Sequence, residues 1–373
     1  MTTASDETAP ATESPDTVQL LTPEGERVSH PDFSFTGSDE DIAGYLRDMV
    51  LSRRIDAEAT ALQRQGELGL WAPCLGQEAA QVGSGRAARE QDFIFPTYRE
   101  HGVAWCRGVD PVRLTAMFRG VDMGGWAGQG NFHLYTVVIG SQTLHAVGYA
   151  MGISNDGLVG NQDPDRDAAV IAYFGDGATS QGDVNESFIF ASSYNAPVVF
   201  FCQNNQWAIS EPITRQSRIP LYQRAHGFGF PGVRVDGNDV LAVHAVTTWA
   251  LDRARNGEGP TFIEAFTYRM GAHTTSDDPS KYRLATELET WKLKDPIERV
   301  RAYLSRKGVV DQKFFADLEA ESDDLAAELR QRTLNLPNPS LADTFDLVYA
   351  DQTNYLRGQQ ERYRAYAQSF EEA

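Results

Sequence analysis

The chain has 373 residues, 41% of them hydrophobic, and a formal net charge of −19. This length supports one large domain or two closely packed ones. An acidic surface repels phosphate backbones and anionic lipids, which argues against nucleic-acid binding and membrane docking. The sequence contains no run of about 18 apolar residues such as a membrane span needs, and neither a secretory signal nor an Arg-rich transit sequence is recognisable. We therefore expect a cytoplasmic protein.

Three cysteines, Cys74, Cys106 and Cys202, are widely spaced along the chain. Their odd number and spacing fit neither a disulfide framework nor a zinc site. We therefore expect free, buried thiols, as in a cytosolic protein.

The first part of the chain changes character near residue 39. Residues 1–38 are rich in Thr, Ser, Pro, Asp and Glu and poor in large apolar residues, which predicts a disordered or extended, loosely attached arm. Helical periodicity begins at Asp39 and runs toward Leu62, and its acidic first turn suits a helix N-terminus. Residues 76–88 predict a second helix with a face of small residues.

The middle of the chain alternates between strand and helix patterns. Apolar runs predict strands at 168–174, 197–202, 232–236 and 260–266, and helices are expected at 183–194 and 239–256. Continuous apolar runs are typical of strands covered on both faces, and the alternation indicates a doubly wound, mostly parallel α/β sheet. We expect this α/β domain to span residues 39–285, with a helical C-terminal region over 286–373.

Two polar motifs follow neighbouring predicted strands. Gly175-Asp176-Gly177 ends the first strand, and Asn204-Asn205 ends the next. Parallel strands deliver their C-terminal ends to one edge of the sheet, where ligands of open α/β sheets bind, so Asp176 and Asn205 should converge. Magnesium prefers an octahedron of hard oxygens, commonly one or two carboxylates with phosphate oxygens. The Asp176 carboxylate, the Asn205 amide oxygen and the Trp207 carbonyl therefore form a candidate magnesium site that a diphosphate would complete.

The residues around these motifs favour the same ligand. Glycines beside Asp176 let the backbone approach a ligand closely, and the helix expected near Gly182 directs the positive end of its dipole toward the crevice. Either motif alone would be an ordinary turn or loop. Their pairing at two strand ends is what indicates a cofactor site.

With these motifs the sequence resembles the thiamine-diphosphate enzymes, above all the E1 α subunits of branched-chain 2-oxo acid and pyruvate dehydrogenase complexes. The resemblance runs from about Asp41 to about Tyr355. Its clearest blocks are 76–79, 95–100, 140–142, 175–186, 203–210, 234–240 and 268–278. It implies the thiamine-diphosphate-binding fold, with this chain as the domain that holds the diphosphate.

The resemblance assigns the metal and diphosphate contacts residue by residue. Asp176, Asn205 and the Trp207 carbonyl correspond to the magnesium ligands. Gly177 and Ala178 correspond to backbone contacts with the diphosphate.

Further positions of the family fall outside those two motifs. Tyr98 and Arg99 correspond to a Tyr-Arg pair that binds the diphosphate, and an Arg fork facing phosphate is chemically reasonable. Val137 and Ile139 correspond to residues that lie against the cofactor rings, although by composition they would be core strand.

Two residues are candidates for catalysis. His273 matches the active-site histidine of the loop on the phosphate side, and a His in a polar, turn-rich loop is a better functional candidate than one in a core. Glu78 is a candidate for the proton network near the cofactor, and its alternative role is a helix cap or a buried salt bridge.

The sequence also departs from the family. Gln203 replaces an Arg that often precedes the Asn-Asn motif, which removes one positive contact to the diphosphate. Thr274 stands where mitochondrial relatives carry a phosphorylatable Ser, which leaves kinase control an open question. The segment between Gly130 and Ile139 is shorter than in better-known relatives. In some relatives a monovalent cation binds at the positions of Thr136, Val138, Ser141 and Gln142.

The resemblance implies a reaction and its partners. The family decarboxylates a 2-oxo acid oxidatively and transfers the acyl group to a lipoyl group on the E2 component. Because the sequence has no motif for the pyrimidine half of the cofactor, we expect a separate β subunit to supply it within an α2β2 heterotetramer. A branched-chain substrate is preferred, and the alternatives are a pyruvate or acetoin enzyme and a non-catalytic binding subunit of the same fold.

Overall fold

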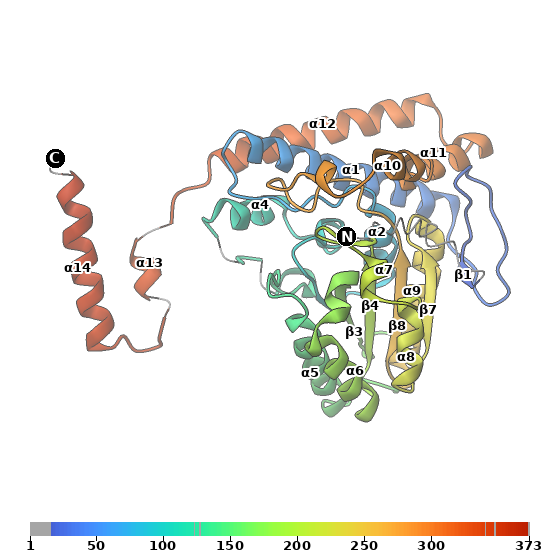
Figure 1. The fold of residues 1–373 in the computed structure, drawn as a ribbon, viewed down its shortest axis with the longest axis horizontal. Coiled ribbons are helices and arrows are strands. Elements are labelled where there is room, and N and C mark those ends of the chain that lie inside the picture. Colours follow the sequence, from blue (N-terminus) through green and yellow to red (C-terminus); the bar gives the residue numbers. More distant parts are fainter. Residues whose placement is uncertain (1–15, 123, 127, 340, 347, 372–373) are drawn as a thin grey trace, which may run out of the picture.

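The computed structural model describes residues 16–371 except 123, 127, 340 and 347 (Figure 1). Its main sheet has six strands, each parallel to its neighbours, in the order β1-β7-β8-β4-β3-β2. The strands are β1 (Thr17–Val18), β2 (Phe93–Phe95), β3 (Val170–Gly175), β4 (Val198–Asn204), β7 (Gly232–Asp236) and β8 (Thr261–Phe266). A separate antiparallel pair, β5 (Trp207–Ala208) and β6 (Glu211–Pro212), follows β4.

Helices connect and cover these strands. The α-helices are α1 (Asp39–Arg64), α2 (Glu78–Ala87), α3 (His101–Cys106), α4 (Pro111–Arg119), α5 (Ser141–Asn155), α6 (Gly182–Ser193), α7 (Ile213–Gln216), α8 (Arg224–Gly227), α9 (Val240–Arg255), α10 (Ala285–Lys292), α11 (Pro296–Lys307), α12 (Gln312–Leu334), α13 (Leu341–Asp346) and α14 (Asn354–Glu371). The short 3-10 turns are η1 (Gln129–Asn131), η2 (Asp176–Ser180), η3 (Leu221–Gln223) and η4 (Pro279–Lys281).

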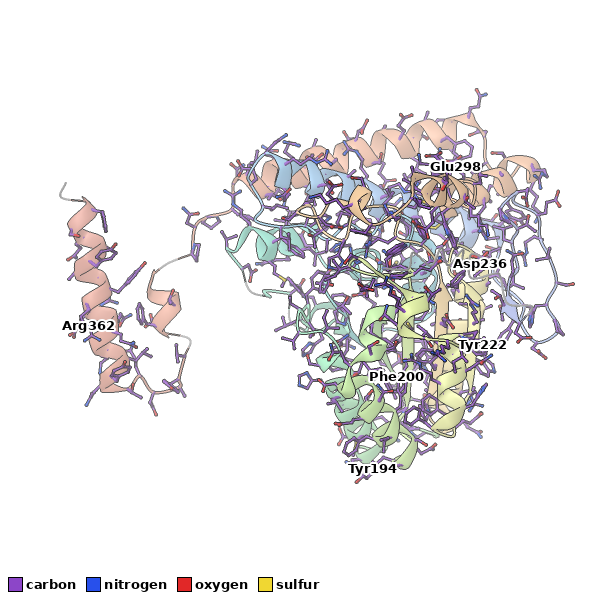
Figure 2. The ribbon with its side chains drawn as sticks, viewed as in Figure 1. Tyr194, Phe200, Tyr222, Asp236, Glu298 and Arg362 are labelled. Atoms are coloured by element: carbon purple, nitrogen blue, oxygen red, sulfur yellow. The ribbon has the colours of Figure 1, made fainter. Side chains whose placement is uncertain are left out.

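The sheet separates two hydrophobic cores, because successive strand side chains point to opposite faces. In β3, Ile171 and Tyr173 join a core with α1, α2 and α9, whereas Ala172 and Phe174 join a core with α5 and α6. Phe200, labelled in Figure 2, belongs to the second core. Burial on both faces explains the continuous apolar runs, and the expected doubly wound α/β fold is confirmed.

The N-terminal segment differs from the expected loose arm. β1 pairs with β7 at the edge of the sheet, and Leu20 and Leu21 are buried. Both of their backbone N–H groups donate to Asp239 Oδ2, at 2.6 Å each. The expectation is therefore corrected for residues 16–38, since backbone hydrogen bonds and a few apolar side chains anchor a segment of polar composition. Residues 1–15 lie outside the described residues.

The long helix α1 begins where the sequence predicts. Ser38 accepts a hydrogen bond from the Asp41 N–H, and the Asp41 carboxylate accepts one from the Ser38 N–H, which together form a capping box. Helices α11 and α12 pack along α1 (Figure 1). By contrast, α13 and α14 stand apart from the rest of the chain, and Arg362 marks α14 in Figure 2.

The cysteines and helices of the described part of the chain show the following. Cys74, Cys106 and Cys202 are free, and residues 16–371 with their four gaps contain no group of three or more His, Cys, Asp or Glu able to hold a metal ion. Within the same residues, no helix is long and apolar enough to cross a membrane.

Candidate functional site

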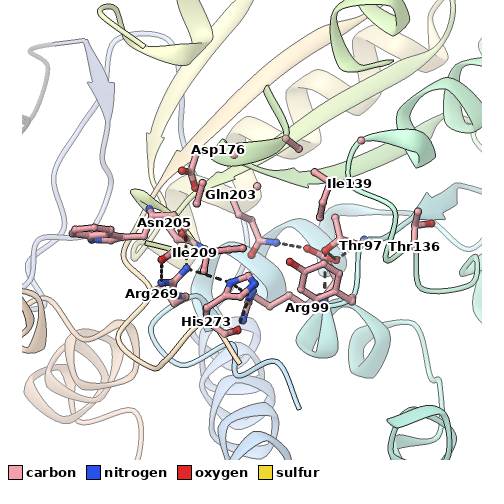
Figure 3. A pocket seen from close by; sticks show the side chains of 18 of the residues that line it. Thr97, Arg99, Thr136, Ile139, Asp176, Gln203, Asn205, Ile209, Arg269 and His273 are labelled. Carbon is pink, nitrogen blue, oxygen red and sulfur yellow. Dashed lines mark hydrogen bonds between the residues drawn. The ribbon is translucent and has the colours of Figure 1, made fainter. Parts of the chain in front are cut away.

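A cavity of about 250 Å³ opens at the C-terminal ends of β3 and β4 (Figure 3). Gly175 of β3 pairs with Gln203 of β4, so the residues that follow each strand meet there. Most of the predicted site residues line this cavity, namely Tyr98, Arg99, Ile139, Asp176, Gly177, Ala178, Asn205, Trp207 and His273. Segments far apart in the sequence therefore form one site.

Three oxygens converge on one wall of the cavity. The Asn205 Oδ1 position lies 3.3 Å from Asp176 Oδ1 and 3.2 Å from the Trp207 carbonyl oxygen. Ligand oxygens about 2.1 Å from an octahedral Mg²⁺ lie about 3.0 Å from one another, close to this spacing. Burial raises the pKa of Asp176 to about 6. A cation between the three oxygens would offset both the oxygen–oxygen repulsion and that burial, so the residues fit a magnesium ion.

The backbone is shaped to bring these oxygens together. Gln206, between Asn205 and Trp207, has a φ of +71°, a left-handed conformation that costs an L-residue roughly 1–2 kcal/mol. Its side chain stabilises the turn by donating to the Thr267 carbonyl at 2.7 Å. Gly177 has a separate constraint, because a Cβ there would lie 2.7 Å from Ala208 Cβ. A glycine is therefore required at position 177 because β5 packs against η2.

Two buried cations also line the cavity. Arg99 is 6% exposed and Arg269 is 0% exposed. Arg99 donates to the carbonyls of Pro73 (2.6 Å) and His273 (2.9 Å). Arg269 donates to the carbonyls of Trp207 and Ile209, at 2.9 and 2.7 Å, and its buried Nε has no partner in the described part of the chain.

Neither cation has a direct ion-pair partner among the described residues. Among the ion pairs of the described residues, none includes Arg99 or Arg269. Buried charges are normally paired, because an isolated charge is costly to remove from water. The cavity therefore has the electrostatics of an anion site, and a diphosphate carries the charge that the two guanidinium groups lack.

His273 lies between these two cations. Its Nδ1 is 3.1 Å from an Arg99 nitrogen, and a guanidinium only donates, so Nδ1 accepts and Nε2 carries the proton. Burial, followed by the charges of Arg99 and Arg269, lowers the pKa of His273 to about 3. The loop is fixed by Asp277, which accepts from the His273 N–H at 2.9 Å. His273 thus presents a neutral ring whose Nε2–H is a donor.

Two predicted residues lie elsewhere. Glu78 is fully buried but does not line the cavity. Its carboxylate pairs with Arg53 at 2.7 Å and accepts from the Gly76 N–H at 2.9 Å, which is the alternative role considered from the sequence. Val137 is 61% exposed and also does not line the cavity, whereas Ile139 does.

Gln203 stands where the family often has Arg, and here its neutral amide forms two hydrogen bonds within the protein. It donates to Glu100 Oε1 at 2.6 Å and accepts from Gln81 at 3.2 Å. Glu100 Oε2 accepts from Thr97, so both Glu100 oxygens are occupied, and burial raises the pKa of Glu100. Arg269 supplies a positive charge to the same cavity and was not among the site residues predicted from the sequence.

Arg269 and Gln77 are two of the lining residues that sequence reasoning missed. Arg269 follows β8, which lies next to β4, so the strand-end argument used for Asp176 and Asn205 extends to it. Gln77 precedes α2, and neither spacing nor composition marked it for the cavity.

Comparisons with known proteins identify the family of this chain. A family model described as "Dehydrogenase E1 component" matches residues 46–340. The 3-methyl-2-oxobutanoate dehydrogenase subunit alpha of Mycobacterium tuberculosis is 44% identical over 354 residues, covering 93% of each chain. Pyruvate dehydrogenase E1 component subunits alpha are 36% identical in Bacillus cereus (94% of this chain, 92% of that protein) and 39% identical in Acholeplasma laidlawii (88% and 94%). The chain therefore belongs to the dehydrogenase E1 component family, among the α subunits of thiamine-diphosphate-dependent 2-oxo acid dehydrogenases.

Proposed function

We propose that this chain is the α subunit of a branched-chain 2-oxo acid dehydrogenase, and that its cavity holds the magnesium and diphosphate of thiamine diphosphate. The observation that supports this most directly is the pair of buried guanidinium groups, Arg99 and Arg269, in one cavity with three convergent oxygens. Asp176, Asn205 and the Trp207 carbonyl would coordinate the metal.

The diphosphate would be held by other residues that line the cavity. Arg99 and Arg269 would donate to its oxygens together with Tyr98 and the backbone N–H groups of Gly177 and Ala178. Hydrogen bonds between a guanidinium and an anion are about twice as strong as neutral ones, so these two groups would contribute most of the diphosphate affinity.

Thiamine diphosphate, when bound, supplies a carbon nucleophile and an electron sink for decarboxylation of a 2-oxo acid. The residues of this chain anchor and orient the cofactor. His273 donates from Nε2 at the cavity wall, where it would stabilise negative charge during acyl transfer to a lipoyl group. Ile139 would lie against the cofactor rings.

A β subunit is part of the proposal. In this family, a glutamate must contact the cofactor's pyrimidine, and the described cavity-lining carboxylates are Asp176 and Glu100. Asp176 faces the metal position and both Glu100 oxygens are occupied. We therefore assign the activating glutamate to the β subunit of an α2β2 heterotetramer, which passes acyl groups to the lipoyl domain of E2. The cytoplasmic location and the monovalent cation also remain predictions.

Three candidate compounds test which substrate the enzyme prefers. The co-purified α and β subunits are assayed with 3-methyl-2-oxobutanoate, pyruvate and acetoin, using an artificial electron acceptor, thiamine diphosphate and Mg²⁺. We expect the highest kcat/KM with 3-methyl-2-oxobutanoate, in line with the name of the 44% identical relative. Preference for pyruvate or acetoin would overturn the substrate, and cofactor binding without turnover would favour a non-catalytic subunit.

A further inference from the structure

The triplet Gly76-Gln77-Glu78 stands before α2, and its outer residues have structural roles. Gly76 has a φ of +92°, and a Cβ there would lie 2.5 Å from the Tyr268 carbonyl oxygen. Glu78 pairs with Arg53 and accepts from the Gly76 N–H. The segment is also tied to the chain after β8, because Thr267 donates to the Gly76 carbonyl at 2.9 Å. The flanking residues thus fix the backbone of Gln77.

Gln77 is the member of the triplet that lines the cavity. It is 0% exposed, and its Oε1 accepts a hydrogen bond from Asn205 Nδ2 at 3.0 Å. Its Nε2 is buried without a partner among the described residues. A buried amide donor left unpaired costs about 1–3 kcal/mol, so this orientation needs a compensating interaction.

The hydrogen bond from Asn205 to Gln77 decides which amide atom of Asn205 faces Asp176. With Nδ2 on Gln77, Oδ1 faces Asp176 Oδ1 at 3.3 Å and the Trp207 carbonyl at 3.2 Å. If both amides turned over, Gln77 Nε2 would donate to Asn205, and Asn205 Nδ2 would donate to the other two oxygens. That second arrangement presents an N–H to the metal position, and it takes away the Asn205 Oδ1 that accepts from the Trp207 N–H at 3.3 Å. The first arrangement is the one that a cation stabilises.

We propose that Gln77 is a positioning residue for the metal site, which acts by holding the Asn205 amide with its oxygen toward the cation. This inference rests on the proposed magnesium site and adds a residue to it. While Gln77 Oε1 accepts from Asn205 Nδ2, Asn205 presents its Oδ1 to the metal position. Residues that orient metal ligands typically change metal affinity about 10- to 100-fold when they are replaced.

Two substitutions of Gln77 distinguish its effect on the orientation of the Asn205 amide from its effect on packing. Gln77→Met keeps the length of the side chain and removes the acceptor. Gln77→Glu can only accept when ionised, so it keeps Asn205 Nδ2 turned away from the metal. The measurement is Mn²⁺ binding to the α and β subunits co-purified as a complex, with thiamine diphosphate present, followed by electron paramagnetic resonance of the free ion. We expect the Mn²⁺ Kd to rise about 10- to 100-fold for Gln77→Met and to stay within about threefold of wild type, or to fall, for Gln77→Glu.

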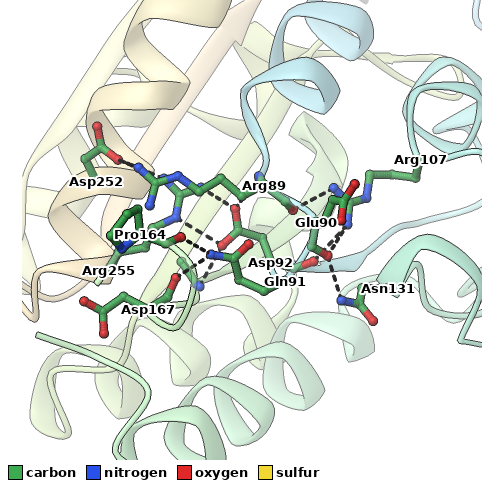
Figure 4. Close-up of polar contacts among 11 residues, drawn as sticks. Arg89, Glu90, Gln91, Asp92, Arg107, Asn131, Pro164, Asp167, Asp252 and Arg255 are labelled. Carbon is green, nitrogen blue, oxygen red and sulfur yellow. Dashed lines mark hydrogen bonds and ion pairs between the residues drawn. The ribbon is translucent and has the colours of Figure 1, made fainter. Parts of the chain in front are cut away.

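A matched control uses another glutamine. Gln91 donates to the carbonyls of Pro164 and Asp167, at 2.7 and 3.0 Å, in the cluster of Figure 4, and it does not line the cavity. Gln91→Met should leave the Mn²⁺ Kd unchanged. In an Asn205→Ala background, Gln77→Met should have no further effect on binding, because the two residues act as one unit.

The outcomes have distinct meanings. An unchanged Mn²⁺ Kd in Gln77→Met, equal weakening in both Gln77 variants, or a full additional effect in the Asn205→Ala background overturns the role of Gln77. If Gln77→Met does not assemble, Gln77→Glu decides alone, and weakened binding there contradicts the proposal. A wild-type complex that fails to bind Mn²⁺ with thiamine diphosphate overturns the proposed magnesium site itself.

Discussion

Replacement of Arg99 tests whether the cavity binds a diphosphate. A guanidinium has five N–H donors. In Arg99, three of them are directed to the Pro73 carbonyl, the His273 carbonyl and His273 Nδ1. Two therefore remain for a ligand. At about 1.5–3 kcal/mol for each charge-assisted hydrogen bond, Arg99→Met should weaken thiamine diphosphate binding by about 3–6 kcal/mol, or roughly 10²- to 10⁴-fold.

The assay compares three variants of the complex by calorimetric titration with thiamine diphosphate in excess Mg²⁺. Arg99→Lys keeps the charge without the planar fork, so its Kd should fall between those of wild type and Arg99→Met. Arg253→Met, which removes an arginine on α9 that pairs with Glu258 away from the cavity, is the control and should bind as wild type does. A Kd for Arg99→Met within threefold of wild type would refute the reasoning.

Four further predictions rest on the same structure. Asp176→Ala should abolish Mg²⁺-dependent retention of the cofactor through gel filtration, because it removes the charged ligand of the proposed metal shell, and full retention would contradict that role. His273→Ala should reduce reductive acylation of a lipoyl domain more than decarboxylation with an artificial acceptor; equal losses with a collapse of cofactor affinity would make it a phosphate anchor. In the cofactor-free protein, NMR should show a neutral His273 ring from pH 8 to pH 5, because its pKa is held near 3. The free energy of unfolding should fall as pH drops below 6.5, since only the unfolded chain then takes up the proton. Glu78→Gln should lower the thermal midpoint, at a cost of about 3 kcal/mol for the broken buried pair with Arg53, while the cofactor Kd stays unchanged; a large change in Kd would return Glu78 to the active site.

The sequence predicted the centre of the fold better than its edges. The four strands of the middle region carry apolar runs that both cores require, and each is present within a few residues of its expected bounds. β1 and β2 have two and three residues, too few for a periodic pattern. β1 was missed because its partners, Asp239 and β7, lie more than 200 positions away.

The sequence likewise predicted some of the site residues and not others. Asp176 and Asn205 could be placed together from the sequence because the geometry of parallel strands brings strand ends to one edge. The roles of Gln77 and Glu78 could not be separated, since adjacent residues in a turn point in directions that only tertiary packing fixes. For Glu78 the deciding contact is Arg53, on a different helix. The pairing of Gln203 with Glu100 likewise depends on a loop about 100 positions upstream.

The anchored N-terminal strand has a practical consequence for anyone who shortens this protein. A truncation at residue 38, chosen because the segment before it looks dispensable, would uncover β7 as an edge strand with free backbone groups. It would also remove the hydrogen bond that Gln19 donates to Asp236 and those that the Leu20 and Leu21 N–H groups donate to Asp239. Uncovered edge strands pair with other chains, so such a variant should aggregate. An affinity tag is better fused ahead of residue 16 than in place of the residues that follow it.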